Sequence, residues 1–366
     1  MPNLFDYLEW RGDLTFDQVP LGPVDALVLT TMSYVHFRDI LPEGPDHPVL
    51  LEEAAMAFLA LPKEEREKRV RSRMDEELLI KLLECPRFSS LRLSCHVDRL
   101  DEEAELQFAA MAVDLGVHGT FVAFRGTDNS LVGWKEDFNM SFQDAIPAQG
   151  MARDYLEQCA QWIQGDLILG GHSKGGNLAV YAASMCSPRV RNRVKVVFSH
   201  DSPGFNDRIM NSEGYLELLS RIYSFVPQSS VVGMLLEHRE PYSVVKSKHI
   251  GVFQHDPYTW TVRRGDFIRL HDITEGSRML NQTVKNWAAG MTNEERCEIV
   301  DTVYDLLQTT QADRVQELLQ PKNIYSILKA VRKEDDESRH MVAEALGQLA
   351  KSALQTLKDQ KLSEGK

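Results

Sequence analysis

The chain has few cysteines, and none of them are paired in a motif. Five occur in 366 residues, scattered and never spaced as C-x-x-C: Cys85, Cys95, Cys159, Cys186 and Cys297. This pattern excludes a disulfide framework and a cysteine zinc site. We expect reduced thiols that fill the core as small hydrophobes, and a cytoplasmic location. No HExxH is present and no two histidines are four residues apart, so we expect no metal and no cofactor.

Positive charge is also scarce. Lysine and arginine number 41 against 54 aspartates and glutamates, a formal net charge of −13. We therefore expect neither nucleic acid nor an anionic membrane as a partner. No uninterrupted apolar run approaches the roughly 18–20 residues of a membrane span. The start, "MPNLFDYLEWRGDL", has no basic segment before an apolar run, so we expect no signal peptide. These absences leave the oligomeric state open.

Strand-like and helical segments alternate from about residue 119 to residue 270. The strand-like runs include "GTFVAFRG" (119–126), "DLILGG" (166–171), "RVKVVFSH" (193–200) and "RIYSFVPQ" (221–228). An amphipathic helix is predicted for "MARDYLEQCAQWI" (151–163). This alternation predicts an α/β fold with a mainly parallel, doubly wound sheet.

Helical patterns dominate the two ends of the chain. Residues 47–61 and 74–85 have helical periodicity, whereas residues 24–37 fit either a strand or the start of a buried helix. Residues 105–115 also fit strand or helix. From about residue 280 the pattern is almost wholly helical. We therefore expect one domain over residues 1–280, including a helical N-terminal extension, and a C-terminal helical appendage over residues 281–366.

A serine stands at the centre of a glycine-rich turn between a predicted strand and a predicted helix. The turn reads "GGHSKGG" (170–176) and contains G-x-S-x-G, with Ser173 in the middle. Small residues two positions either side let strand and helix approach, and a strained serine then projects its Oγ from the sheet. The order Gly-Lys-Ser/Thr of a phosphate-binding loop is absent. The pattern favours a nucleophile.

A serine nucleophile needs a base, a carboxylate and donors for the oxyanion. In this arrangement the three side chains follow the order Ser, Asp/Glu, His along the chain. Asp201, at the end of the next predicted strand, is the favoured acid, and Glu237 is a distant second. His255, in a turn late in the chain, is the favoured base. His249 and His271 are the competitors.

The motifs also resemble those of known families. Two motifs look like those of the fungal-type (class 3) lipases. One is a strand ending in "FRGT" (124–127) that is followed by a Trp and an Asp, and the other is an elbow with His before Ser. Five segments, in their order along the chain, are similar to those of the bacterial Mbeg-like family of lipase-like proteins. They are "FDYLEWRGDL", "GHSKGGNLA", "DSPGF", "VPQSSVVGML" and "QHDPYTW". The resemblance covers about residues 1–270 and implies an α/β-hydrolase fold.

The resemblance also assigns an oxyanion hole. It implies that Thr127 is one donor; the N–H of Lys174, which follows the nucleophile, is the other. Arg125 is expected to form a structural ion pair, with Asp137 as the suggested partner, and not to touch substrate. Two departures stand out: the class 3 lipases usually carry leucine at the position of Lys174, and their acid comes from a later loop. That loop corresponds to residues 225–233 here, and it has serines but no carboxylate.

The sequence therefore predicts a serine hydrolase that cleaves carboxylic esters through an acyl-enzyme. The apolar stretch "SVVGMLLEH" (230–238) either walls an acyl pocket or belongs to the core. The first reading favours lipid-like or medium-chain acyl esters as small-molecule substrates. Thioesterase and acyltransferase activities stay open. The alternative from another class is an α/β-hydrolase scaffold that has lost turnover and acts by binding proteins.

Overall fold

The computed structural model describes residues 1–128, 130–140, 143–249, 251–278 and 292–308. The chain forms two compact units. The first comprises Met1–Leu100, Gln107–Gly126 and Pro147–Lys285; the second comprises Asp101–Leu106, Thr127–Ile146 and Asn286–Lys366. Each unit is described by itself below.

A mainly parallel sheet forms the centre of the first unit. In the part of the chain that the structure describes, its order is β1-β2-β3-β4-β5-β6-β7-β8-β11. Strands β4 to β8 pair in parallel, and β1 with β2, β3 with β4, and β11 with β8 pair antiparallel. The bounds are β1 Val49–Leu50, β2 Arg92–Asp101, β3 Leu106–Asp114, β4 Thr120–Phe124, β5 Leu167–His172, β6 Val194–His200, β7 Ile222–Pro227, β8 Tyr242–Val245 and β11 Arg269–Leu270. The predicted mainly parallel α/β sheet is confirmed.

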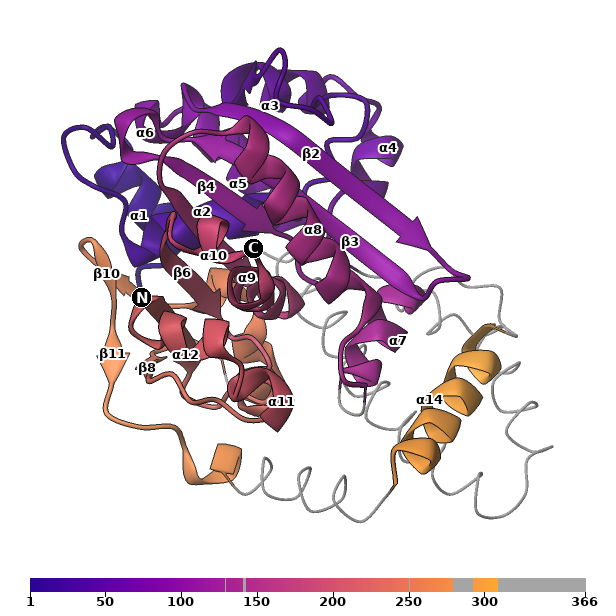
Figure 1. The fold of residues 1–366 in the computed structure, drawn as a ribbon. Coiled ribbons are helices and arrows are strands. Elements are labelled where there is room, and N and C mark those ends of the chain that lie inside the picture. The colour runs from indigo at the N-terminus through magenta and orange to yellow at the C-terminus, as the bar shows by residue number, and fades with distance from the viewer. Residues whose placement is uncertain (129, 141–142, 250, 279–291, 309–366) are drawn as a thin grey trace. The chain divides into compact units, whose positions relative to one another are not determined.

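Helices cover both faces of this sheet. Helices α8 (Pro147–Trp162) and α9 (Lys174–Met185) lie in front of the strands in Figure 1, and α2 (Pro23–Met32) lies behind them. Two neighbouring glycines of β5 show the same division. A Cβ on Gly170 would approach Thr30 of α2, and a Cβ on Gly171 would meet the first turn of α9. Successive strand residues point to opposite faces, so His172 projects toward the α2 side.

The N-terminal extension is helical, as expected. Its helices are α1 Leu4–Arg11, α2, α3 Leu51–Leu59, α4 Lys63–Lys68, α5 Arg73–Leu83 and α6 Pro86–Ser89. The ambiguous run after residue 23 is a helix, because Pro23 occupies the first helical position and the Asp25 carboxylate accepts the Gly22 N–H at 2.8 Å. The second ambiguous run is strand β3, which pairs with β4 from Ala110 to Asp114.

Short helices connect the later strands. They are α10 Pro188–Arg191, α11 Asp207–Met210, α12 Glu213–Leu218, η4 Gly251–His255 and η5 Pro257–Thr259. His255, expected in a turn, is the last residue of the 3₁₀-helix η4. A two-stranded sheet, β9 (Val262–Arg263) with β10 (Asp266–Phe267), follows.

The second unit contains α7 (Leu131–Asn139) and α14 (Asn293–Gln308). Lys135 of α7 pairs with Glu105 at 2.6 Å and with Asp301 of α14 at 2.7 Å. Helix α14 agrees with the helical pattern expected after residue 280. The predicted boundary at 280 and the segment after residue 308 lie outside the described residues. Within the described residues, no helix has the length and hydropathy needed to span a membrane.

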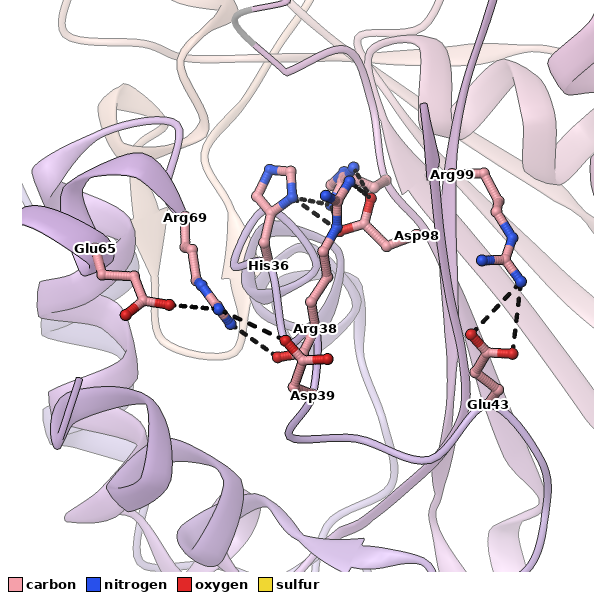
Figure 2. Close-up of polar contacts among 9 residues, drawn as sticks. His36, Arg38, Asp39, Glu43, Glu65, Arg69, Asp98 and Arg99 are labelled. Atoms are coloured by element: carbon pink, nitrogen blue, oxygen red, sulfur yellow. Dashed lines mark hydrogen bonds and ion pairs between the residues drawn. The ribbon is translucent and has the colours of Figure 1, made fainter. Parts of the chain in front are cut away.

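A buried ion-pair cluster ties the extension to the sheet of the first unit. Asp98 of β2 receives hydrogen bonds from Arg125 at 2.8 Å, from the His36 ring at 2.8 Å and from Arg38 at 3.2 Å. Figure 2 shows this cluster beside a part-buried pair, Arg69–Glu65, and an exposed pair, Arg99–Glu43. Burial would raise the pKa of Asp98, but His36 and Arg125 outweigh it and hold that pKa far below its usual range. The expected structural ion pair of Arg125 is confirmed, and its partner is Asp98 where Asp137 had been suggested.

Candidate active site

Ser173 alone makes the turn from β5 to α9. Strand β5 ends at His172 and the helix begins at Lys174. The backbone of Ser173 has φ +59° and ψ −135°, a conformation that residues with a side chain rarely adopt. Strain of this kind persists only where the surrounding structure enforces it, and it concentrates at functional sites. The side chain of Ser173 is half-buried.

The flanking glycines allow this turn because no side chain would fit. A Cβ on Gly171 would lie 2.0 Å from the carbonyl carbon of Gly175. A Cβ on Gly175 would lie 2.2 Å from the carbonyl oxygen of Phe124 on β4. These contacts are with backbone, which has little freedom to yield. The strand-to-helix approach therefore depends on glycine at both positions.

Asp201 and His255, which are 54 residues apart, form a hydrogen-bonded pair. His255 Nδ1 lies 2.7 Å from Asp201 Oδ2. The carboxylate is fully buried, whereas the imidazole side chain is 23% exposed. A carboxylate on Nδ1 fixes the tautomer in which Nε2 carries a lone pair, the state that a general base requires. The pair is thus a buried acid that orients an accessible base.

Two further donors hold the Asp201 carboxylate in place. Its Oδ1 accepts the Ser230 hydroxyl and, at 3.0 Å, the Gly233 N–H. The Ser230 Oγ also accepts the Gly233 N–H at 2.9 Å. Burying a charge is costly unless it is hydrogen-bonded, and these donors together with His255 satisfy it. The loop that supplies the acid in class 3 lipases supplies a serine that supports Asp201 here.

Neighbouring strand ends bring Ser173 and Asp201 to the same edge of the sheet. Strands β5 and β6 are parallel neighbours in which His172 pairs with His200. The Ser173 N–H donates to the His200 carbonyl at 2.9 Å, and Asp201 follows directly. The carboxyl ends of parallel strands are where α/β proteins bind ligands.

His255 reaches this edge from η4. Its carbonyl oxygen lies 2.7 Å from His172 Nε2, and the two imidazole centroids are 4.6 Å apart. The preceding carbonyl, of Gln254, accepts the indole N–H of Trp260 at 2.8 Å. No hydrogen bond joins the Ser173 hydroxyl to the His255 imidazole in the described part of the chain. Such bonds commonly tighten only when substrate is bound.

The two buried histidines beside the site are neutral. Burial lowers the pKa of His172 well below its usual value, with the nearby His255 and Arg71 acting in the same direction. Burial also lowers the pKa of His200 to about 4. The His200 ring lies among Phe198, Phe225 and other aromatic rings.

The proposed oxyanion donors have distinct surroundings. Thr127 belongs to the second unit, where its hydroxyl donates to Asp137 Oδ1 at 2.6 Å. Lys174 is the first residue of α9, and its buried ammonium group donates to the Gln107 carbonyl at 3.0 Å and to Gln107 Oε1 at 2.7 Å. The lysine that replaces the usual leucine therefore anchors the elbow to β3.

The competing candidates are exposed side chains. Glu237, His249 and His271 are all exposed. The main chain of His249 makes hydrogen bonds with Ser247 and Gln254. Among the described residues, no cluster of three or more His, Cys, Asp or Glu side chains has the arrangement of a metal site.

Sequence reasoning missed three residues that the structure brings to the site. Ser230 donates a hydrogen bond to the Asp201 carboxylate. The Tyr34 hydroxyl lies 2.8 Å from His172 Nδ1. The Arg71 guanidinium lies 3.6 Å from the carboxylate of Asp256, which follows His255 in the chain. Tyr34 is 138 residues from His172, so no local pattern connects them. Ser230 carried a weak signal, since its loop corresponds to the acid loop of the resembled family.

Comparisons with known proteins identify a family and several solved structures to which this chain is similar. A family model described as Mbeg1-like matches residues 82–305. Among solved structures, the native Rhizomucor miehei lipase propeptide complex is 15% identical, with 54% of this chain and 67% of that chain covered and a TM-score of 0.35. M37 lipase is 12% identical, with 59% and 70% covered and a TM-score of 0.36. A triacylglycerol lipase, titled as having a serine protease triad at its catalytic centre, is 14% identical, with 64% and 80% covered and a TM-score of 0.34. The search of curated proteins gave no match.

Proposed function

This chain belongs to the Mbeg1-like family and has an α/β-hydrolase fold, and from that premise we propose that it is a serine hydrolase cleaving carboxylic esters through an acyl-enzyme. One observation carries the proposal. A strained Ser173 stands at the strand-to-helix turn, and a buried Asp201 orients the ring of His255, whose carbonyl contacts His172, the residue before Ser173. Nothing in the packing of a structural turn requires this pair.

The proposed reaction has two halves. Ser173 Oγ attacks the ester carbonyl carbon while His255 Nε2 takes the hydroxyl proton. The oxyanion collapses, the bond to the leaving alkoxide breaks, and His255 returns the proton to it. Water then attacks the acyl-enzyme by the same route, which releases the carboxylic acid and regenerates Ser173. Asp201 stays ionised throughout and stabilises the imidazolium.

The main-chain N–H of Lys174 is the proposed first oxyanion donor, because it belongs to the first turn of α9, where the helix dipole favours negative charge. Thr127 is the proposed second donor. Within the second unit its hydroxyl donates a hydrogen bond to Asp137 Oδ1 at 2.6 Å. Asp137 then holds Thr127 in position.

Residues after Ser230 support an apolar acyl group. Val231, Val232, Met234 and Leu235 are partly exposed, and Met234 packs against the cluster of Val226, Val244 and Ile273. The net charge of −13 disfavours anionic substrates. We propose lipid-like or medium-chain acyl esters. The cytoplasmic location stays a prediction, which four buried free thiols support.

A panel of chromogenic esters of graded chain length tests the proposal. We expect turnover with an optimum at medium chain length, and a fall in kcat on the order of 10⁶ in Ser173→Ala. Ser90→Ala is the matched control, because Ser90 is an exposed serine directly after helix α6, and we expect this variant to have the wild-type kcat. Ser173→Ala activity within about tenfold of wild type would contradict a serine mechanism. No turnover of any ester by the wild type would favour the protein-binding scaffold.

A further inference from the structure

We propose that Tyr34 is a positioning residue for the base: through His172 it holds the main chain of His255 in the geometry that catalysis uses. This inference rests on the proposed serine-hydrolase function. Tyr34 follows helix α2 in the N-terminal extension, outside the residues matched by the family model. The extension would then complete the site and not merely cover the sheet.

The two nitrogens of the His172 ring have different partners. Nε2 lies 2.7 Å from the carbonyl oxygen of His255, and Nδ1 lies 2.8 Å from the hydroxyl of Tyr34. A carbonyl oxygen only accepts hydrogen bonds, so Nε2 must carry a proton. In a neutral ring Nδ1 then has the lone pair, and the Tyr34 hydroxyl must donate to it. The hydroxyl also lies 3.4 Å from the His172 carbonyl, a much weaker contact.

His172 is neutral under ordinary conditions, as this assignment requires. Its side chain is almost fully buried at 1% exposure. Burial, with His255 and Arg71 nearby, keeps the pKa of the ring well below its usual value. The ring therefore has one N–H to give, and Tyr34 decides that this N–H faces His255. Without the Tyr34 hydroxyl, Nδ1 becomes a buried acceptor with no donor from that side.

A second contact from the extension reaches the next residue along the chain. The Arg71 guanidinium stacks on the Tyr34 ring at 4.6 Å and lies 3.6 Å from Asp256 Oδ1. It also lies 3.6 Å from Asp75 Oδ1 on α5. Arg71 therefore fixes the ring of Tyr34 and pairs with the neighbour of His255. The two contacts hold the main chain on the C-terminal side of the imidazole.

These contacts matter because the base is held from both ends. Asp201 fixes the Nδ1 edge of the His255 ring, and His172 fixes the carbonyl of the same residue. The 3₁₀-helix η4 is only five residues long and does not by itself define the position of its last side chain. A base displaced by about 1 Å loses rate on the order of 10²-fold. Loss of the Tyr34 hydroxyl should therefore reduce kcat without weakening substrate binding.

The test compares Tyr34→Phe with Tyr155→Phe. Tyr155 is the matched control, since it is also buried and its hydroxyl also donates a hydrogen bond at 2.8 Å, in this case to the Cys95 carbonyl on β2. We expect Tyr34→Phe to lower kcat by roughly tenfold or more with KM little altered. Tyr155→Phe should keep the wild-type kcat. Equal kcat values in both variants would overturn the proposal.

Nitrogen-15 NMR of histidine-labelled protein provides a readout independent of turnover. In the wild type, His172 should show a protonated Nε2 and an unprotonated Nδ1. In Tyr34→Phe, the Nδ1 resonance should shift or the tautomers should mix. A wild-type His172 protonated on Nδ1 would overturn the proposal whatever the kinetics. If the wild type hydrolyses no ester, the proposed function fails, and the spectra still decide whether Tyr34 sets the tautomer of His172.

Discussion

At the scale of single residues, the geometry of the site depends on the hydrogen bonds that the buried carboxylate of Asp201 accepts. Asp201 accepts hydrogen bonds from His255, Ser230 and Gly233 and is fully buried. Its backbone, like that of Ser173, has a positive φ, +48°. The acid is therefore held by side-chain and main-chain contacts at once, which favours a fixed orientation of the imidazole.

Replacing the acid tests this orientation. Asp201→Asn keeps the size but gives the amide a donor group that disfavours the Nδ1–H tautomer of His255. By analogy with serine proteases we expect kcat to fall about 10⁴-fold. Steady-state kinetics on the best ester of the panel measures it. A loss below tenfold, with a folded variant by circular dichroism, would remove Asp201 from the role of acid.

Ser230 tests the support of the acid. Ser230→Ala removes one donor from a buried carboxylate, and we expect kcat to fall by roughly tenfold, since a hydrogen bond to a charged group contributes about 1.5–3 kcal/mol. Ser229→Ala is the matched control, because the neighbouring hydroxyl contacts Thr274 and not Asp201. Indistinguishable kcat values for the two variants would show that Ser230 does not tune the site.

At the scale of elements, the elbow between β5 and α9 is the part best predicted from sequence. The glycine pattern, the apolar strand before it and the helix after it are local features, and steric exclusion at Gly171 and Gly175 explains them. The secondary structure of the ambiguous apolar runs was harder to predict. Periodicity alone did not separate strand from helix in residues 105–115, and pairing with β4 resolved it. Tertiary contacts decide such short apolar runs.

Two glycine substitutions test the account of the elbow. Gly171→Ala places a Cβ 2.0 Å from backbone of Gly175, so we expect a large loss of thermal stability or of soluble expression. Gly150→Ala, in helix α8, meets nothing within 4 Å. It should stabilise the protein by about 0.5–1 kcal/mol because alanine is the better helix former. Thermal denaturation measures both. A stable Gly171→Ala protein would contradict the tight turn.

At the scale of the whole molecule, contacts between distant segments explain what the sequence did not reveal. The pairing of Asp201 with His255 was expected from chain order and position. The contact of Tyr34 with His172 spans 138 residues, and the contact of Asp98 with Arg125 joins two strands and the extension. No local pattern encodes such contacts, because they arise only when the sheet assembles. The chain as a whole also buries several neutral histidines.

These histidines predict a loss of stability in mild acid. Burial lowers the pKa of His96 and of His200 to about 4, and that of His172 well below its usual value. Above about pH 6.5 these histidines are neutral in both the folded and the unfolded chain, so they do not change the free energy of unfolding. As the pH falls from about 6.5 toward 4, the unfolded chain binds protons that the folded chain does not, so the free energy of unfolding decreases. Asp75, whose pKa is raised, acts in the opposite direction.

Urea denaturation at several pH values measures how steeply the free energy of unfolding changes with pH. Each such histidine contributes about 1.4 kcal/mol per pH unit within its window. His200→Phe keeps an aromatic ring among Phe198 and Phe225 and should reduce the slope by about one proton. An unchanged slope in this variant would show that His200 is not buried as a neutral ring.

The central claim, that Ser173 is a nucleophile activated by His255, is tested most directly by a fluorophosphonate probe with mass spectrometry of the labelled peptide. A serine reacts rapidly with such a probe only when a base removes its proton. We predict one adduct, on Ser173, in the native wild type, and labelling slowed by orders of magnitude in His255→Ala but not in His249→Ala. Absence of an adduct on Ser173 in the native protein, or equal labelling of wild type and His255→Ala, would contradict the account.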